Sequence, residues 1–191
     1  MSTRERILDA AAQVMREQGV AHATTKEIAR AAGCSEALLY RHFDDKQGLF
    51  MAVLRERLPG FALPDSAVGS GTVEGNLALL VTGLLAFYVD SFPISASIFS
   101  SSTLLARHRE AIAAHGAGPQ APRLRVQAYL EAERAAGRVR ADADLGAVAR
   151  LLVGAALHQA FLAAFWDDGS AAEPGLGQRL VAPVLPALLP A

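Results

Sequence analysis

The sequence predicts an all-α protein, and three observations support this. Apolar residues make up 52% of the 191 residues and are mostly Ala and Leu, which are strong helix formers. They recur at intervals of three and four residues, as on one face of a helix. Few stretches show the alternating Val, Ile, Thr and Tyr, bounded by turns, that is typical of strands. We therefore expect about nine helices, divided between an N-terminal head and a larger C-terminal body.

Bulk composition narrows the class of protein. The single cysteine, Cys34, excludes an intramolecular disulfide. The charged N-terminus is unlike a signal peptide, and the longest uncharged apolar stretch, Leu77–Val89, is too short to span a bilayer as a helix. We expect a cytoplasmic protein with no membrane partner. The net charge of −1 is no sign of nucleic-acid binding, which would have to depend on where the charges lie.

Four helices are expected before residue 59. They cover Thr3–Gln18, from Thr24 or Thr25 to Gly33, Ser35 to about His42, and from Asp44 to the residues before Pro59. Ser2 with Glu5 has the spacing of a capping box, and Glu27 completes another at the start of the second helix. Gly19 lies where a glycine cap ends the first helix.

The segment 59–71, rich in Pro, Gly, Ala and Ser, is predicted to be a linker. Five further helices follow it. They cover Thr72–Phe92, ended by Pro93; Ile94–Ala114, kinked near Ser100–Ser102; Arg123–Ala136; Leu145–Trp166; and Leu176–Leu189, shortened or bent by Pro183 and Pro186.

The second and third helices have the arrangement of a helix-turn-helix. They are short, and Gly33 provides the tight turn between them because glycine adopts a positive φ without strain. The inward faces are supplied by Ile28, Ala29, Ala32, Leu39 and Phe43. The outward face of the third helix would then enter the major groove. That face carries Glu36, Ala37, Leu38 and Arg41.

The helix over Leu145–Trp166 is apolar on two faces and must be covered on two sides. One cover is its own domain, and the other is predicted to be a partner subunit. We assign one stripe to a dimer interface: Leu145, Val148, Leu152, Ala155, Gln159, Leu162 and Trp166. The second stripe carries Leu151, Gly154, His158, Phe161 and Phe165.

Several side chains of the body are candidates to line a small-molecule pocket. They are Phe87, Tyr88, Phe99, His108, Tyr129, His158, Phe161 and Phe165. The alternative for each of them is an ordinary core residue. His158 is the strongest candidate, because a polar group on an apolar face must find a hydrogen-bond partner or a ligand.

Residues 25–46, TKEIARAAGCSEALLYRHFDDK, resemble the signature of the TetR family of bacterial regulators. The resemblance covers about residues 3–54, and the segment AAGRVRADADLGAVARLLVGA resembles the family's approach to its dimerisation helix. The matching positions of the head are Thr25, Ile28, Ala29, Gly33, Leu39, Tyr40, Phe43, Lys46 and Leu49. The resemblance implies a three-helix DNA-binding head over 1–46 and a ligand-binding and dimerisation domain over 47–191.

The resemblance also implies roles for individual side chains. Thr25, Tyr40, His42 and Lys46 would contact phosphates, and Glu36, Ala37 and Leu38 would face bases, with Lys26 and Arg41 as further base contacts. Glu36 would accept from a cytosine amino group, and Leu38 would pack on a thymine methyl. Lys26 and Glu36 stand where other members have Arg and Gln, so the operator sequence is not implied.

The function implied is that of a dimeric repressor of operator DNA, released by a small apolar or amphipathic effector that shifts the fourth helix. The near-neutral head favours an alternative, a helical small-molecule-binding protein without DNA binding. An enzyme is a third class. The sequence lacks GxSxG, HExxH, P-loop and CxxC motifs, and its five histidines lack zinc spacing. We therefore predict no catalytic residues, no metal and no cofactor.

Overall fold

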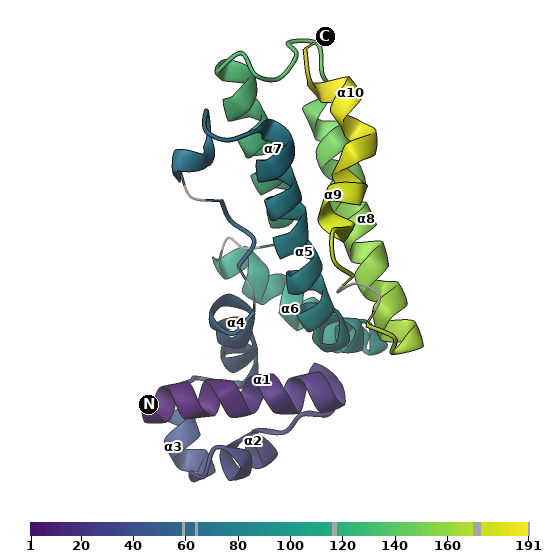
Figure 1. Ribbon diagram of the computed structural model, residues 1–191. Coiled ribbons are helices and arrows are strands. Elements are labelled where there is room, and N and C mark those ends of the chain that lie inside the picture. Colours follow the sequence, from purple (N-terminus) through teal and green to yellow (C-terminus); the bar gives the residue numbers. More distant parts are fainter. Residues whose placement is uncertain (59, 64, 116–117, 170–172, 191) are drawn as a thin grey trace. The chain divides into compact units, whose positions relative to one another are not determined.

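The computed structural model describes residues 1–58, 60–63, 65–115, 118–169 and 173–190, and every regular element in these ranges is a helix. The all-α prediction is therefore confirmed for the described part of the chain. The chain packs as two compact units, each built from two stretches. Unit 1 comprises Met1–Leu58 with Asp90–Gly118, and unit 2 comprises Pro59–Val89 with Pro119–Ala191. Figure 1 shows the helices of both units, labelled in chain order.

The first helix, α1 (Thr3–His22), begins at the predicted residue and runs past the predicted end. The Ser2 hydroxyl accepts from the Glu5 N–H, and the Glu5 carboxylate accepts from the Ser2 N–H, so the predicted capping box is present. Gly19 leaves the helical conformation at φ 73° and ψ 161°, and a short helical turn follows it. The predicted end is thus a break inside α1, at a backbone conformation that favours glycine.

The predicted helix-turn-helix consists of α2 (Thr25–Ala31) and α3 (Glu36–Tyr40). Thr24 and Glu27 form the second capping box, and the Ser35 hydroxyl accepts from the Leu38 N–H at 3.2 Å to begin α3. Gly33 has a φ of 65°, as the tight turn requires. α3 is shorter than predicted, because the chain turns at Arg41 and His42.

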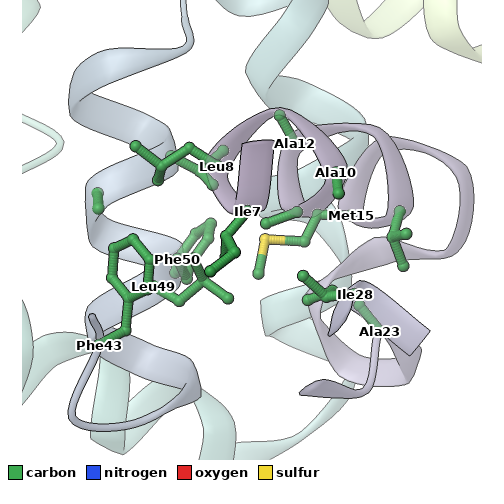
Figure 2. Packing of buried hydrophobic residues seen from close by; sticks show 14 of the residues in the cluster. Ile7, Leu8, Ala10, Ala12, Met15, Ala23, Ile28, Phe43, Leu49 and Phe50 are labelled. Carbon is green, nitrogen blue, oxygen red and sulfur yellow. The ribbon is translucent and has the colours of Figure 1, made fainter. Parts of the chain in front are cut away.

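The fourth helix, α4 (Lys46–Glu56), is capped by Asp45 and not by the predicted Asp44. The Asp45 carboxylate accepts from the Gly48 N–H at 2.7 Å, which is the bond that an N-cap makes to the third helical residue. Figure 2 shows the core that holds these helices together, with side chains from α1, α2 and α4 converging on one another. Fully buried members include Ile7, Leu8, Met15, Ile28, Leu39, Leu49 and Phe50.

The expectation that Pro93 ends the fifth helix is wrong, because α5 (Val73–Ala96) continues through it. Pro93 removes only the hydrogen bond to the Val89 carbonyl, and the helix then tightens into η2 (Ser97–Ser100). Burial of Ile94 and Ile98 in the core of unit 1 offsets that loss. The break before α6 (Ser102–His115) comes at an extended Ser101, within the predicted Ser100–Ser102 run.

Unit 2 is built around α8 (Leu145–Trp166), whose bounds are those predicted, and α7 (Ala121–Ala135) packs along it. The predicted linker holds one short helix, η1 (Asp65–Ala67), while its residues 59 and 64 lie outside the described residues. The C-terminal segment divides where its two prolines lie. Its parts are α9 (Leu176–Val181), η4 (Ala182–Val184) and α10 (Leu185–Leu188).

Packing does not divide the chain at residue 46. α4 and residues 90–118 belong to the same unit as α1, α2 and α3, and they share one apolar core. The predicted head, 1–46, is therefore part of a larger unit. The boundary at 46 stays a prediction about which residues meet DNA.

Two helical stretches are long and apolar enough to cross a bilayer. They are Val73–Ser100, with a mean hydropathy of 1.8, and Leu145–Trp166, with a mean hydropathy of 1.6. The first is longer than Leu77–Val89, because Pro93 does not end the helix. Core helices of soluble proteins pass the same test, so this is a weak indication, and the expectation of no membrane partner stays a prediction.

Candidate nucleic-acid interface

The short helix α3 lies at the surface of unit 1. Its Leu39 is fully buried in the core, whereas Tyr40 is 47% exposed. The predicted DNA contacts on α3 and in the turn after it are exposed or partly exposed: Glu36, Ala37, Leu38, Tyr40, Arg41 and His42. One buried residue thus fixes the helix and leaves a continuous polar and apolar face open to solvent.

Three predicted contacts from α2 and α3 form one hydrogen-bonded cluster. The Thr25 hydroxyl donates to a carboxylate oxygen of Glu36, and its oxygen lies 3.2 Å from the Tyr40 hydroxyl. Thr25 and Glu36 are partly buried. The predicted phosphate contacts Thr25 and Tyr40 therefore come together, and Glu36, predicted to face a base, is bonded back toward α2.

The two predicted lysine contacts differ in their surroundings. Lys26 is exposed on α2, while Lys46 is partly buried at the start of α4. Burial lowers the pKa of Lys46 from its usual value. Among the described residues, no ion pair joins Lys46 to Asp44 or Asp45, so its ammonium group is not neutralised by the adjacent carboxylates.

The predicted pocket residues do not come together at one site. Phe99 and His108 belong to unit 1, and the other six belong to unit 2. Phe99 is 74% exposed. His108 packs against Phe50 with ring centroids 5.3 Å apart, and its Nδ1 lies 3.1 Å from the Gln47 amide nitrogen. Burial lowers the pKa of His108.

Within unit 2 the remaining pocket candidates lie in three different surroundings. Phe87 and Tyr88 pack edge to face at 5.3 Å, and Phe61 packs on Phe87 at 5.0 Å. Burial raises the pKa of Tyr88 to about 12 and that of Tyr129 to about 12. The last three candidates, His158, Phe161 and Phe165, are exposed along α8. The pocket candidates therefore lie in separate clusters, and their role in binding a ligand stays a prediction.

The structure reverses the two stripes of α8. Leu145, Val148 and Leu152, which were assigned to a dimer interface, are 4%, 6% and 1% exposed and belong to the core of unit 2. Ala155, Gln159 and Leu162 of the same stripe are partly exposed. Trp166, its last member, is exposed. The exposed apolar stripe is the other one: Leu151, Gly154, His158, Phe161 and Phe165.

Periodicity could not decide between the stripes, because both repeat at helical intervals and both are apolar. The choice is made by the helices that pack on α8: α7 covers one side, and residues of α5 and α9 belong to the same core. Sequence reasoning also missed Gln47, whose contact with His108 gives no local signal, and Leu157, which is 41% exposed on α8.

A shallow groove of about 470 Å³ in unit 2 does not coincide with the predicted pocket residues. It is lined by residues of α5 and the segment before it, and by one residue of α9. The polar lining residues are Thr72, Glu74, Asn76, Thr82 and Gln178. The Asn76 amide already donates to the carbonyls of Ala67 and Ser70, which explains its presence there as part of the loop packing.

Comparison with known proteins identifies the head. Residues 7–53 match the family model described as bacterial regulatory proteins, tetR family. The N-terminal head of the chain is therefore of the TetR type. The matched residues extend from Ile7 in α1 to Val53 in α4. They include the whole helix-turn-helix and the cluster of Thr25, Glu36 and Tyr40.

Two relatives illustrate the extent of the match. The uncharacterized HTH-type transcriptional regulator YvkB of Bacillus subtilis (strain 168) is 50% identical over 54 residues, which are 28% of this chain and 29% of YvkB. The HTH-type transcriptional repressor BepR of Brucella suis biovar 1 (strain 1330) is 47% identical over 58 residues, 30% of this chain and 28% of BepR. The aligned segments therefore span less than a third of either relative.

A solved structure has a similar fold over nearly the whole chain. The crystal structure of a candidate TetR-family transcriptional regulator from Mesorhizobium loti MAFF303099 superposes with a TM-score of 0.70 at 21% identity, covering 98% of this chain and 97% of that one. This confirms the predicted architecture, an N-terminal helix-turn-helix head followed by a helical C-terminal domain. The family model describes regulatory proteins, and YvkB and BepR are named as a transcriptional regulator and a transcriptional repressor.

Proposed function

We propose that this protein is a transcriptional regulator that binds operator DNA through α2, α3 and the first turn of α4. The observation that carries the proposal is the solvent face of α3, which buried Leu39 fixes and on which the Tyr40 hydroxyl lies beside that of Thr25 from α2. A helix-turn-helix places such a face in the major groove. The match of residues 7–53 to the tetR family model supports the same function.

In this proposal, hydroxyl and cationic groups position the head on the phosphate backbone, and the rest of the face reads bases. The phosphate contacts are Thr25, Tyr40, His42 and Lys46. The base contacts are Lys26, Glu36, Ala37, Leu38 and Arg41. Phosphate contacts are independent of sequence and weaken with salt, whereas base contacts discriminate between duplexes.

The test is fluorescence anisotropy with a duplex from the region upstream of the protein's own gene and with a scrambled duplex. Lys46→Ala should weaken binding to both, and should reduce the slope of log affinity against log salt by about one. The matched control is Arg134→Ala, which removes an exposed cation from unit 2. Absence of binding to any duplex at low salt would refute the proposal and leave the small-molecule-binding alternative.

We propose further that the protein acts as a homodimer, joined along the exposed stripe of α8. The stripe repeats at intervals of three and four residues, so it forms a straight seam that suits an antiparallel or crossed helix pair. Gly154 lies within it, and a Cβ there would meet no atom within 4 Å. The space above Gly154 is open in a single copy of the chain, and the lack of a side chain there would let a second helix approach closely. Two recognition helices would then meet successive major grooves roughly 34 Å apart.

Gly154→Glu tests the dimer without weakening the helix, because glutamate is a better helix former than glycine. Light scattering should show a dimer for the wild type and a monomer for this variant at equal concentration, with unchanged circular dichroism. Ala128→Glu, on an exposed position of α7, is the control and should remain dimeric. A monomeric wild type contradicts the proposal, and so does flotation of the wild type with lipid vesicles, since the seam would then face a membrane.

The effector is proposed to be a small apolar or amphipathic molecule that releases the protein from its operator and so relieves repression. Repression is supported by the name of BepR, a repressor with the same kind of head. Native mass spectrometry of protein purified from its own host should show a retained molecule, and adding that molecule should lower the anisotropy of the bound duplex. Retention of the duplex in the presence of the molecule contradicts this part of the proposal.

A further inference from the structure

We propose that Glu36 restrains the affinity of the head for DNA by holding the hydroxyl protons of Thr25 and Tyr40 away from the phosphate backbone. This inference depends on the proposed DNA-binding function, but it replaces the base contact proposed above for Glu36 with a restraining role. It is carried by the hydrogen-bonded cluster that joins the three side chains.

The direction of each hydrogen bond in the cluster follows from counting protons. A threonine hydroxyl has one proton, and an ionised carboxylate only accepts. Thr25 therefore donates its proton to Glu36, and the 3.2 Å contact between its oxygen and the Tyr40 hydroxyl is one in which Tyr40 donates. Both protons thus point in the same direction, from Tyr40 through Thr25 to the Glu36 carboxylate. Bonds aligned in this way strengthen one another.

Phosphate oxygens need donors, and this chain of bonds uses both donors internally. Tyr40, although 47% exposed, then presents lone pairs to an approaching phosphate. Binding requires the hydroxyls to turn outward, which breaks a charge-assisted bond that is roughly twice as strong as a neutral one. It also leaves the Glu36 charge without its donor beside the phosphate charge.

Among the described residues, Glu36 takes part in no ion pair, even though exposed Lys26 follows Thr25 directly in α2. Glu36 is partly buried, so its charge is less screened than that of a fully exposed carboxylate. The restraint acts on every duplex, because phosphates are the same in all of them, and it leaves base contacts at the operator to overcome it.

The experiment compares wild type, Glu36→Gln, Tyr40→Phe and the double variant on the upstream duplex and on a scrambled duplex, by anisotropy at low salt. Glutamine has the shape of glutamate without the charge. We expect Glu36→Gln to raise affinity for both duplexes roughly threefold to tenfold. Tyr40→Phe should weaken wild-type binding by only about twofold, but should weaken the Glu36→Gln variant by about fivefold or more. Glu131→Gln, an exposed change in unit 2, is the control for net charge and should have no effect.

Each other outcome contradicts a different claim. Weaker binding of Glu36→Gln to the upstream duplex alone would show that Glu36 reads a base and would overturn the restraint. Equal effects of Tyr40→Phe in both backgrounds would reduce the role of Glu36 to charge repulsion and overturn the proton chain. Failure of both wild type and Glu36→Gln to bind any duplex refutes the DNA-binding function itself, whereas binding by Glu36→Gln alone supports the restraint.

Discussion

Replacing Gly19 by Ala tests the packing that holds the head in unit 1. Gly19 has φ 73° and ψ 161°, a region that is essentially restricted to glycine and that strains other residues by about 1–3 kcal/mol. A Cβ at this position would lie 2.6 Å from the Ser97 Cβ and 2.9 Å from its Oγ. Ser97 would have to move, and its hydroxyl now accepts from the Val20 N–H at 2.8 Å and from the Ala21 N–H at 3.4 Å.

Displacing Ser97 leaves at least one backbone donor without its acceptor, which destabilises by about 1–2 kcal/mol. Together with the backbone strain, Gly19→Ala should lower the free energy of unfolding by about 3 kcal/mol. In a protein of this size that corresponds to a fall in melting temperature of roughly 6–12 °C. The assay is urea unfolding followed by circular dichroism, with fluorescence of Trp166, the single tryptophan, reporting on unit 2.

Two comparisons separate strain from collision. Gly33→Ala, in the same unit, has φ 65° but meets no atom within 4 Å, so it should lose only about 1 kcal/mol. In a Ser97→Gly background the collision is absent, and Gly19→Ala should then resemble Gly33→Ala. Equal unfolding midpoints for Gly19→Ala and Gly33→Ala in the Ser97 background would refute the reasoning.

Two further predictions concern charged groups. Hydrogen bonding to Arg4, and next to Arg55, lowers the pKa of Glu56 to about 2. The ionised Glu56 therefore stabilises the folded protein by about 1 kcal/mol after allowance for solvent screening. This contribution is present above about pH 4.5 and is lost as the pH falls toward 2. Glu56→Gln should flatten the acid limb of a stability–pH curve measured by urea unfolding. Glu133 is fully buried and accepts from the Gly69 N–H, with Arg138 at 3.4 Å. Glu133→Ala should destabilise unit 2 by about 2 kcal/mol, seen as an earlier transition of Trp166 fluorescence, and a midpoint unchanged from wild type would contradict it.

The sequence predicts best those features that nearby residues decide. The capping boxes of Ser2 with Glu5 and Thr24 with Glu27 form as expected, because all their atoms lie within one turn of helix. The start of α8 is set by Asp144, whose carboxylate accepts from the Ala147 N–H at 2.9 Å. The turn at Gly33 follows from the conformational freedom of glycine.

Features that depend on distant contacts were not predictable in the same way. α8 is apolar around most of its circumference, and the packing of α7 and of α5 residues decides that Leu152 is buried while Leu151 is 63% exposed. Pro93 stays within α5 because burial of the following turn in the core of unit 1 stabilises the helix there. The bond between Thr25 and Glu36 joins residues eleven positions apart, so the sequence could place both on the DNA-facing side but could not show that they hold each other.

The packing of unit 1 gives the proposed effector response a physical route to DNA. His108 of α6 contacts α4 at Gln47 and Phe50, and Gln47 is the residue next to the proposed phosphate contact Lys46. Ser97 of η2 joins the end of α5 to the break in α1 through two backbone N–H groups. A displacement of α6 or of the end of α5 therefore acts directly on helices that carry or support the DNA-facing residues. Because these contacts are partly buried and join the helices directly, we expect them to transmit such a displacement, so α4 is the element through which ligand binding and operator release would be coupled.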